Sequence, residues 1–413
     1  MLSKAAATVF RHLDPDAWGE RLVRAFFRAA GFSVYRASPW AEMAIEQGML
    51  KGRNRLSKWS WDGKRLALST LESASTSWYR ILDSELSANR RGGYSLKGNT
   101  LGHQAVLAAN PNPKIDFGAR NIGGVLGQKG PSILIERRGV TRSVPRGLFV
   151  GSLSPHNWFH WTVDTLPTIW SLKFLPERFQ DFPIILPKVV NIRATWLEAL
   201  NVVLEGRSVV WVDPDELTKV PELVVVDGLT RCHPRPIASD GGPRIYLDVA
   251  LLSAYRSSVL ANFSLERQIV RGSRYYLARR QDDTRGYNQE ALLEIAIQQG
   301  LKVIYLDQLS YFESVKLFSS AEVLVGPHSA GWAGLLFSPP HVRALFWTWK
   351  DARGDNWYEN LAGFSKAKWR QVELESAMTL NGERSADPRS RAYGLQSESF
   401  SMELRQLVSG IEA

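Results

Sequence analysis

Cysteine is almost absent from this chain of 413 residues, which contains Cys232 alone. No disulfide can form within the chain, and zinc sites built from several cysteines are excluded. Long apolar runs are also missing, because no window approaches the roughly 18 apolar residues of a membrane-spanning helix. The N-terminus lacks the apolar core and cleavage site of a secretory signal. These absences predict a cytoplasmic location.

Three motifs of nucleotide and ester chemistry are missing as well. The chain has no phosphate loop with its lysine, no three-glycine dinucleotide fingerprint after a strand, and no nucleophile-elbow serine. Gly331 and Gly334 supply only a fragment of the dinucleotide spacing. Nucleoside triphosphate hydrolysis, hydride transfer and serine esterase chemistry are therefore disfavoured.

Positive charge is in excess, with 51 Lys and Arg against 41 Asp and Glu and a formal net charge of +10. The positive electrostatic field of such a protein attracts nucleic acid, anionic lipid, acidic glycans and diphosphates alike. The densest basic stretch, residues 51–65, interleaves lysines and arginines with Trp59 and Trp61. It predicts a solvated loop with two anchoring tryptophans; a membrane-surface patch and an acceptor-binding surface are the alternatives.

Residues 14–30 have the pattern of a basic amphipathic helix, because apolar side chains recur at helical spacing with arginines between them. The apolar set is Trp18, Leu22, Val23, Phe26 and Phe27, and the basic set is Arg21, Arg24 and Arg28. We expect the apolar stripe to pack on its own domain. Docking on a membrane surface or a partner is the alternative.

The composition, 44% hydrophobic and 22% charged, is that of a folded globular protein, and the length predicts two domains. Residues 90–150 predict short strands and turns. Apolar runs at 182–186, 208–212 and 222–226, with a helix at 194–204, predict a parallel sheet with crossover helices.

The second half repeats this alternation and predicts a doubly wound unit of the nucleotide-binding kind. The expected helices are 243–263, 288–299, 311–321 and about 332–337, and the expected strands are 275–278, 302–306, 323–325 and 344–347. We therefore expect an α/β fold of two facing Rossmann-like domains with a cleft between them. A polar loop from about 377 to 396 and a final short helix should follow.

Residues 154–170 hold the first group of chemically active side chains. In a helix, His156, His160 and Asp164 would project from one face at successive turns. Such a face can bind substrate or supply a base with its orienting carboxylate; a divalent-metal site and structural histidines are the alternatives. Pro167 would end or bend the helix and leave Asp164 close to an opening.

Two further motifs follow predicted strands of the second half, one rich in arginine and one rich in small residues. Guanidinium groups suit diphosphates, and free N–H groups at a helix start favour phosphate. Ligands bind beyond the carboxyl ends of strands in such sheets, so the two motifs predict one phosphate site, with solvated surface arginines as the alternative. The candidate residues are Arg279, Arg285, Asn288, Gly326, His328, Ser329, Ala330 and Gly331.

In order and separation these segments resemble glycosyltransferase family 61, which includes bacterial capsular and surface-polysaccharide enzymes. The resemblance covers about residues 145–350. The matching residues are Trp158, Phe159, His160, Trp161, Asp164, Pro167, Arg279, Arg285, Asn288, Gly326, Pro327, His328, Ala330, Gly331 and Phe337. Four residues depart from the family's pattern: Ala278 replaces a serine, Gln289 a glutamate, Ser329 a glycine and Gly334 an asparagine.

The resemblance implies a GT-B-like pair of facing domains and an inverting transfer from a UDP-linked nucleotide sugar, with no cofactor and no tightly bound metal. Residues 1–240 would form the acceptor-side domain, 241–376 the donor domain, and 377–413 a linker and C-terminal helix. The acceptor would be a glycan or lipid-linked oligosaccharide of surface-polysaccharide synthesis. We expect peripheral contact with an anionic membrane on its cytoplasmic face and no nucleic-acid partner.

Residue roles complete the hypothesis. Asp164 is expected to be the general base, with His160 orienting it or binding the acceptor; His160 as base is the alternative. Of the other candidates, Arg279, Arg285 and Asn288 would hold the diphosphate, the 326–331 turn the phosphate and nucleoside, and His156, Trp158 and Trp161 the acceptor. The competing functions are a catalytically silent carbohydrate- or nucleotide-binding protein and a nucleic-acid-binding protein.

Overall fold

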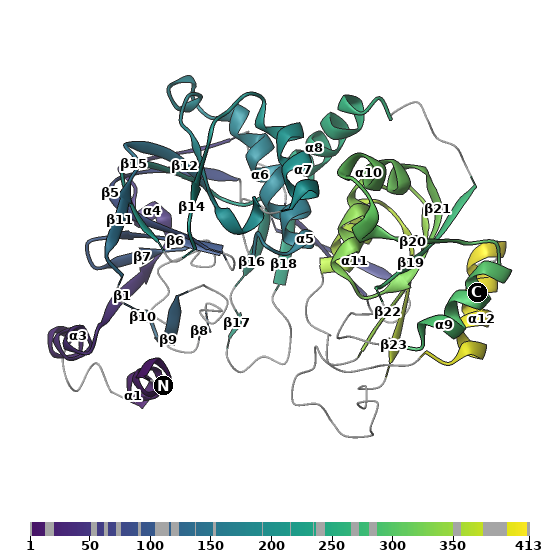
Figure 1. The fold of residues 1–413 in the computed structure, drawn as a ribbon, viewed down its shortest axis with the longest axis horizontal. Coiled ribbons are helices and arrows are strands. Elements are labelled where there is room, and N and C mark those ends of the chain that lie inside the picture. The colour runs from purple at the N-terminus through teal and green to yellow at the C-terminus, as the bar shows by residue number, and fades with distance from the viewer. Residues whose placement is uncertain are drawn as a thin grey trace. The chain divides into compact units, whose positions relative to one another are not determined.

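A computed structural model divides the chain into two compact units (Figure 1). The first comprises Met1–Leu56 and Leu71–Leu252, and the second comprises Ser57–Thr70 and Ser253–Ala413. The structure describes residues 2–12, 20–50, 56–61, 65–71, 76–89, 92–103, 115–116, 124–136, 138–151, 154–191, 193–214, 216–233, 235–236, 244–265, 272–280, 287–349, 357–374 and 395–410.

A mixed sheet forms the core of the first unit. Its parallel group runs in the order β14 (Val209–Val212), β13 (Ile184–Pro187), β12 (Arg146–Val150) and β15 (Leu217–Val226), with β11 (Val140–Ser143) also parallel to β15. The order continues from β15 through β5 (Ser77–Asn89), β6 (Gly92–Lys97), β7 (Thr100–Gly102), β1 (Phe32–Ser38), β10 (Ser132–Glu136) and β9 (Val125–Lys129), while β2 (Glu46–Met49) pairs with β5. All four residues of β13 are buried, as expected for a parallel strand that is covered on both faces.

Helices and short strands complete the first unit. The helices are α1 (Leu2–His12), α3 (Glu20–Ala29), α4 (Trp40–Met43), α5 (Trp158–His160), η2 (Trp161–Thr165), α6 (Leu166–Ser171), η3 (Leu172–Phe174), η4 (Glu177–Phe179), η5 (Lys188–Val190) and α7 (Ala194–Leu204). Two antiparallel pairs, β16 (Thr230–His233) with β18 (Arg244–Asp248) and β17 (Arg235–Pro236) with β8 (Ile115–Asp116), are also present. Helix α8 (Val249–Asn262) leads from this unit into the second.

The sheet of the first unit differs from the expected pure parallel sheet. The predicted strands at 182–186, 208–212 and 222–226 and the helix at 194–204 are present as β13, β14, β15 and α7. β5, however, is antiparallel to β15. The sheet then continues through β6, which is antiparallel to β5 and forms a hairpin with it. Local patterning does not decide which strand lies beside β15, because that choice is made by packing.

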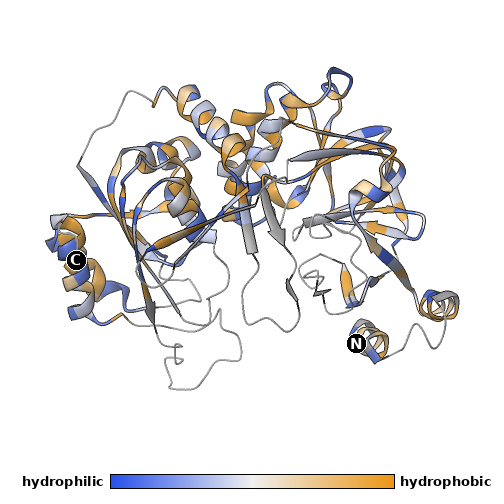
Figure 2. Ribbon diagram, turned by 180° about the vertical axis from the view of Figure 1, so that it is seen from behind, coloured by the Kyte–Doolittle hydropathy of each residue, from blue (hydrophilic) through white to orange (hydrophobic). Residues whose placement is uncertain are grey.

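The predicted basic amphipathic helix is present as α3, and Trp18 lies outside the described residues. Val23 and Phe27 are buried in a cluster with Phe10 of α1, while Leu22 and Phe26 remain exposed. Figure 2 shows hydrophobic and hydrophilic residues side by side on this helix. Among the described residues, no helix is both long enough and apolar enough to cross a membrane.

The second unit is a doubly wound parallel sheet. Its strands are β19 (Ser273–Ala278), β20 (Lys302–Tyr305), β21 (Ala321–Pro327), β22 (Arg343–Trp349) and β23 (Lys368–Leu374), in the spatial order β20-β19-β21-β22-β23. The chain moves from β19 to β20 on one side and then crosses to β21 on the other side. This 2-1-3-4-5 order has its topological switch point between β19 and β21, where ligands bind in such sheets.

Helices cover both faces of this sheet. α9 (Gln289–Gln298) and α12 (Ser397–Ser409) lie on one face, and α10 (Tyr311–Ser320) and α11 (Trp357–Phe364) lie on the other (Figure 1). The 3-10 helices η6 (Leu306–Gln308) and η7 (Ala330–Phe337) complete the crossovers. Adjacent side chains of β22 point to opposite faces of the sheet. Trp347 packs with Phe400 of α12 on one face, and Phe346 packs with Trp332 of η7 on the other.

The predicted helix at 243–263 starts too early, since residues 244–248 form strand β18. The short apolar run at 245–247 fits a strand or one turn of a buried helix, so the pattern alone does not separate the two. Asp248 marks the boundary, because its Oδ1 accepts the N–H of Leu251 at 3.1 Å and caps α8. α11 and β23 were not among the expected elements.

Trp59 of the basic stretch is an internal anchor. It lies on β3 (Leu56–Trp61), which is followed by β4 (Leu66–Leu71). The Trp59 N–H donates to Asn360 Oδ1 at 2.7 Å, and its ring fills the space in which a side chain at Gly363 would stand. Trp59 thus has the anchoring role that the sequence predicts, but residues 56–61 form a strand and not the predicted loop. Lys51, Arg53, Arg55 and Lys64 lie outside the described residues.

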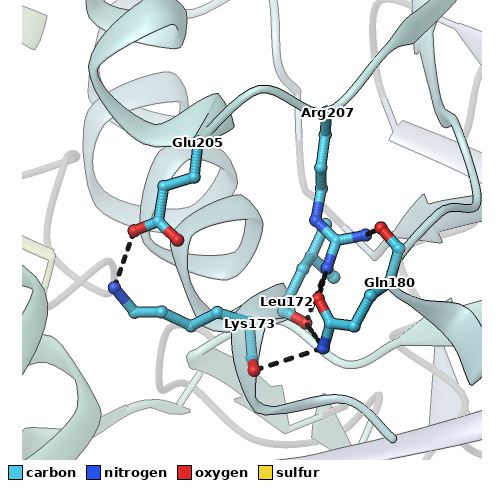
Figure 3. A network of polar contacts seen from close by, with 5 residues as sticks. All are labelled: Leu172, Lys173, Gln180, Glu205 and Arg207. Atoms are coloured by element: carbon cyan, nitrogen blue, oxygen red, sulfur yellow. Dashed lines mark hydrogen bonds and ion pairs between the residues drawn. The ribbon is translucent and has the colours of Figure 1, made fainter. Parts of the chain in front are cut away.

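A polar network closes the helical run that ends with η3 in the first unit (Figure 3). The Arg207 guanidinium donates to the carbonyls of Phe179 and Leu172, both at 3.3 Å, and to the Gln180 side-chain oxygen. The Gln180 amide in turn donates to the carbonyls of Leu172, Lys173 and Leu175. These bonds satisfy carbonyls that the end of a helix leaves without partners.

We predict that Arg207→Ala destabilises the first unit by about 2 kcal/mol, because several carbonyl acceptors lose a charged donor at once. Urea unfolding monitored by circular dichroism measures the change. Lys188→Ala is the control, since the ion pair of Lys188 with Asp213 is about half exposed on both sides and should contribute less than about 1 kcal/mol. Equal losses for the two variants would contradict the proposed capping role.

Candidate active site

A short helical run that changes its winding twice carries the first candidate residues. Asn157 starts α5, because its Oδ1 accepts the N–H of Phe159 at 2.9 Å. The π-helical turn η2 follows, and α6 then continues past Pro167. Pro167 stands in the first turn of α6, where its missing N–H is tolerated. The Thr168 hydroxyl donates to the Asp164 carbonyl at 2.6 Å. Pro167 therefore accompanies a change in winding and does not end the helix.

His160 and Asp164 form a hydrogen-bonded pair across this turn. The distance between His160 Nδ1 and Asp164 Oδ2 is 2.6 Å, and the side chains are 17% and 0% exposed. Burial raises the pKa of Asp164, and the hydrogen bond and charge of His160 lower it in part. Asp164 Oδ1 is buried without a hydrogen-bond partner in the structure. Asp164 is thus enclosed and does not lie at an opening, and the imidazole is the member of the pair that reaches the surface.

The three residues assigned to the acceptor lie in different surroundings. His156 and Trp158 are partly exposed, and the Trp158 ring packs on Trp196 with centroids 4.5 Å apart. Trp161 has no exposed surface, so an acceptor could reach it only after a rearrangement. Within the described residues, no three His, Cys, Asp or Glu side chains gather as a metal site, so His156 does not complete one with His160 and Asp164.

Arg279 and His328 meet at the switch point of the second unit. Each residue directly follows a strand, Arg279 after β19 and His328 after β21, and these strands are parallel neighbours. The Arg279 guanidinium donates to the His328 carbonyl. The arginine motif and the small-residue turn, predicted to share one site, are therefore brought together here. Arg285 lies outside the described residues.

Gln289 fixes the backbone of Arg279. Its Oε1 accepts the Arg279 N–H at 2.7 Å, and its Nε2 donates to the Arg279 carbonyl at 2.9 Å. The Tyr287 hydroxyl donates a second hydrogen bond to Oε1 at 2.6 Å. A glutamate could accept but could not donate to the carbonyl. The sequence marks Gln289 as a departure from a family pattern, and the structure gives the amide a specific use.

Asn288 has both polar atoms of its side chain engaged elsewhere. Nδ2 donates to the Leu395 carbonyl at 2.8 Å, and Oδ1 accepts the Leu395 N–H at 3.1 Å. Asn288 therefore joins the start of α9 to the segment that leads into α12. The assignment of Asn288 to the diphosphate finds no support in these contacts, since its amide faces the chain.

The turn from Gly326 to Gly331 is built for close packing. A Cβ at Gly326 would stand 2.9 Å from Leu277 Cβ on the neighbouring strand, and one at Gly331 would stand 2.3 Å from Leu306. Ser329, which precedes η7, has extended backbone and makes no capping bond with its side chain. Ser329 and Ala330 are partly exposed, so they remain available to a ligand.

Gly334 lies against an aromatic ring. A Cβ built on it would stand 2.1 Å from two ring carbons of Phe318. Phe318 itself is fully buried on α10. The ring thus occupies the volume that an asparagine side chain at position 334 would require.

We predict that Gly334→Ala lowers the free energy of unfolding by about 2 to 3 kcal/mol through overpacking. The same substitution made together with Phe318→Leu should cost less than the sum of the two single changes, because the smaller side chain makes room. Chemical denaturation of all four proteins gives this coupling. Gly139→Ala is the control, since nothing lies within 4 Å of its Cβ. If the loss of stability in the double variant equals the sum of the losses in the two single variants, position 334 and Phe318 are not in direct contact.

We also predict that Asp164→Asn becomes more stable relative to the unchanged protein as the pH rises from about 4 to 7. Burial raises the folded-state pKa of Asp164, so its contribution to stability is full below the unfolded-state pKa and is lost as the pH rises through the folded one. Asparagine does not titrate. Unfolding at several pH values measures the difference, with Asp213→Asn, whose side chain is about half exposed, as the control. A difference that stays constant with pH would contradict the burial effect.

No curated protein matches this chain. The family model described as Glycosyltransferase 61 matches residues 158–345, which begin in the helical run of His160 and Asp164 and end in β22. The match includes Arg279, Gln289 and the turn of His328. Over residues 158–345, somewhat less than half of its length, the chain is similar to glycosyltransferase family 61.

Proposed function

We propose that this protein is an inverting, metal-independent glycosyltransferase with a GT-B-like scaffold. It transfers a sugar from a UDP-linked nucleotide sugar to a hydroxyl of a glycan or lipid-linked oligosaccharide in surface-polysaccharide synthesis. The observation that carries the proposal is the hydrogen bond between His160 and the buried Asp164, inside the region that matches the family.

His160 is the general base of the proposed reaction. With Nδ1 protonated and donating to Asp164, the lone pair of the imidazole is on Nε2, the atom that takes the proton of the acceptor hydroxyl in this proposal. The full burial of Asp164 supports this choice over Asp164 as base, because a substrate hydroxyl would have to reach a side chain that is 0% exposed. Asp164 orients the imidazole and stabilises its protonated form.

One displacement completes the proposed transfer. As the hydroxyl proton passes to His160, the acceptor oxygen bonds to the anomeric carbon, and the bond from that carbon to the donor phosphate breaks. The electron pair of the broken bond leaves with the nucleoside diphosphate. Attack from the face opposite the leaving group inverts the anomeric configuration.

The departing diphosphate gains negative charge and requires positive groups nearby. Backbone N–H groups at the start of η7 meet this need at the switch point between β19 and β21. Arg279, 6% exposed and bonded to the His328 carbonyl, adds its positive charge from behind them. Gln289 and Tyr287 support the site by holding the Arg279 backbone. Positioned arginine and backbone donors can stabilise the leaving group in the role that a metal ion serves elsewhere.

We predict that His160→Gln lowers the transfer rate by about 10²- to 10⁴-fold, because the proton acceptor is lost. Nucleoside diphosphate binding should change little, since Arg279 and its support are intact. Asp164→Asn should lower the rate less than His160→Gln does. The measurements are nucleoside diphosphate release from nucleotide sugars and calorimetric binding of UDP, with His12→Gln on the exposed end of α1 as the control.

Two outcomes would overturn parts of the proposal. A larger loss for Asp164→Asn than for His160→Gln would return the base role to Asp164. Binding of UDP by the unchanged protein without sugar release or transfer, across a panel of nucleotide sugars, would identify a catalytically silent binding protein. Arg279→Lys separates donor binding from chemistry, because it keeps the charge, loses the planar fork and should weaken UDP binding about tenfold.

A further inference from the structure

A cavity of about 670 Å³ lies in the first unit, beside α3. α3, β1, β5, β6, β10 and the residues after β10 contribute to its walls. Its charged lining residues are Arg24, Arg28, Arg138, Glu85 and Glu136. A cavity of this volume is large enough to hold a small polar ligand.

The cavity is distinct from the site of His160 and Asp164. Leu217, the first residue of β15, lines the cavity. Val226, at the other end of this ten-residue strand, pairs with Val150 at the carboxyl end of β12, from which the chain leads to the helical run of His160. Ten residues of strand span roughly 30 Å. The cavity therefore lies toward the amino ends of the parallel strands, whereas the helical run follows their carboxyl ends.

α3 presents a solvent-facing apolar ridge next to this cavity. Leu22 and Phe26 are four residues apart, share one face, and are 63% and 54% exposed. Arg24 and Arg28, also four apart, line the cavity. Ala25 belongs to both regions, because it lines the cavity and is exposed. At 100° per residue, Arg24 and Arg28 lie on one side of exposed Ala25, and Leu22 and Phe26 lie on its other side, on a helix whose buried face is already used.

We propose that α3 and this cavity form a docking site for an anionic membrane surface. Leu22 and Phe26 enter the boundary between headgroups and acyl chains, and the cavity receives the phosphodiester headgroup of a phosphatidylglycerol molecule. Arg24, Arg28 and Arg138 face the phosphate. Glu85 and Glu136 accept hydrogen bonds from the hydroxyl groups of the glycerol headgroup, which explains carboxylates in a cavity that also holds arginines.

The arrangement fits a membrane better than other occupants. A ridge with two large exposed side chains is small for a stable interface between two copies, and a net charge of +10 on each copy opposes their association. An acidic glycan could fill the cavity but would make no use of the exposed ridge. A lipid surface uses both, since amphipathic helices bind anionic bilayers through an apolar face flanked by basic residues.

Vesicle co-flotation tests this proposal without any assay of sugar transfer, so its failure is distinct from failure of the proposed enzyme. The full-length protein is mixed with vesicles of phosphatidylcholine alone or of phosphatidylcholine with phosphatidylglycerol. We expect flotation only with phosphatidylglycerol. The double variant Leu22→Ser/Phe26→Ser and the single variant Arg28→Ala should each bind on the order of tenfold less tightly.

Matched controls come from the second unit. Ile297→Ser removes a side chain that is 59% exposed on α9, and Arg405→Ala removes an exposed arginine on α12; both should bind as the unchanged protein does. Circular dichroism confirms that each variant is folded. Absence of binding, equal weakening by Arg28→Ala and Arg405→Ala, or unchanged binding of the double variant would overturn the proposal. So would a dimer in sedimentation equilibrium that the double variant abolishes, because the ridge would then be an interface between copies.

Discussion

The hydrogen bond from the His160 imidazole to the buried Asp164 carboxylate is the interaction on which the proposed chemistry depends. A carboxylate with no exposed surface is unfavourable unless a neighbour compensates its charge. His160 provides that compensation at 2.6 Å and gains a fixed orientation in return. The surrounding sequence holds the pair at this geometry. Asn157 sets the start of the helical run, Thr168 bonds to the Asp164 carbonyl, and the Arg207 network closes the end.

The donor side is organised by backbone contacts more than by side chains that point at a ligand. The strand order of the second unit creates the switch point. Because β19 and β21 are neighbours in this order, Arg279 and His328 lie at the ends of adjacent strands. Gln289 then holds both polar groups of the Arg279 backbone. Two neighbouring residues of the arginine motif have different contacts. Asn288 hydrogen-bonds to the backbone of Leu395, whereas Gln289 hydrogen-bonds to the backbone of Arg279.

Sequence patterns predicted the second unit well because its strands are short, apolar and separated by amphipathic helices. The same patterns placed His160 with Asp164 and Arg279 with the His328 turn, since helical spacing and strand ends fix those neighbours. They did not reveal that Asp164 is enclosed, because exposure depends on what packs over the helix. They also could not join β5 to β15, a pairing between strands far apart in the chain.

The departures from the family pattern are explained only by contacts that are distant in sequence. The glycine at position 334 is explained by Phe318, whose ring fills the space that a larger side chain would need. The glutamine at position 289 is explained by its hydrogen bond to the carbonyl of Arg279, ten residues away. Gln289 places a neutral amide where the family pattern has a carboxylate, and neither change removes a positive group from the switch point. Both alter contacts around the switch point, so under the proposed function they bear on donor preference more directly than on the proton transfer assigned to His160. Substitutions that change packing behind a site alter its shape, while the groups that perform the chemistry remain in place.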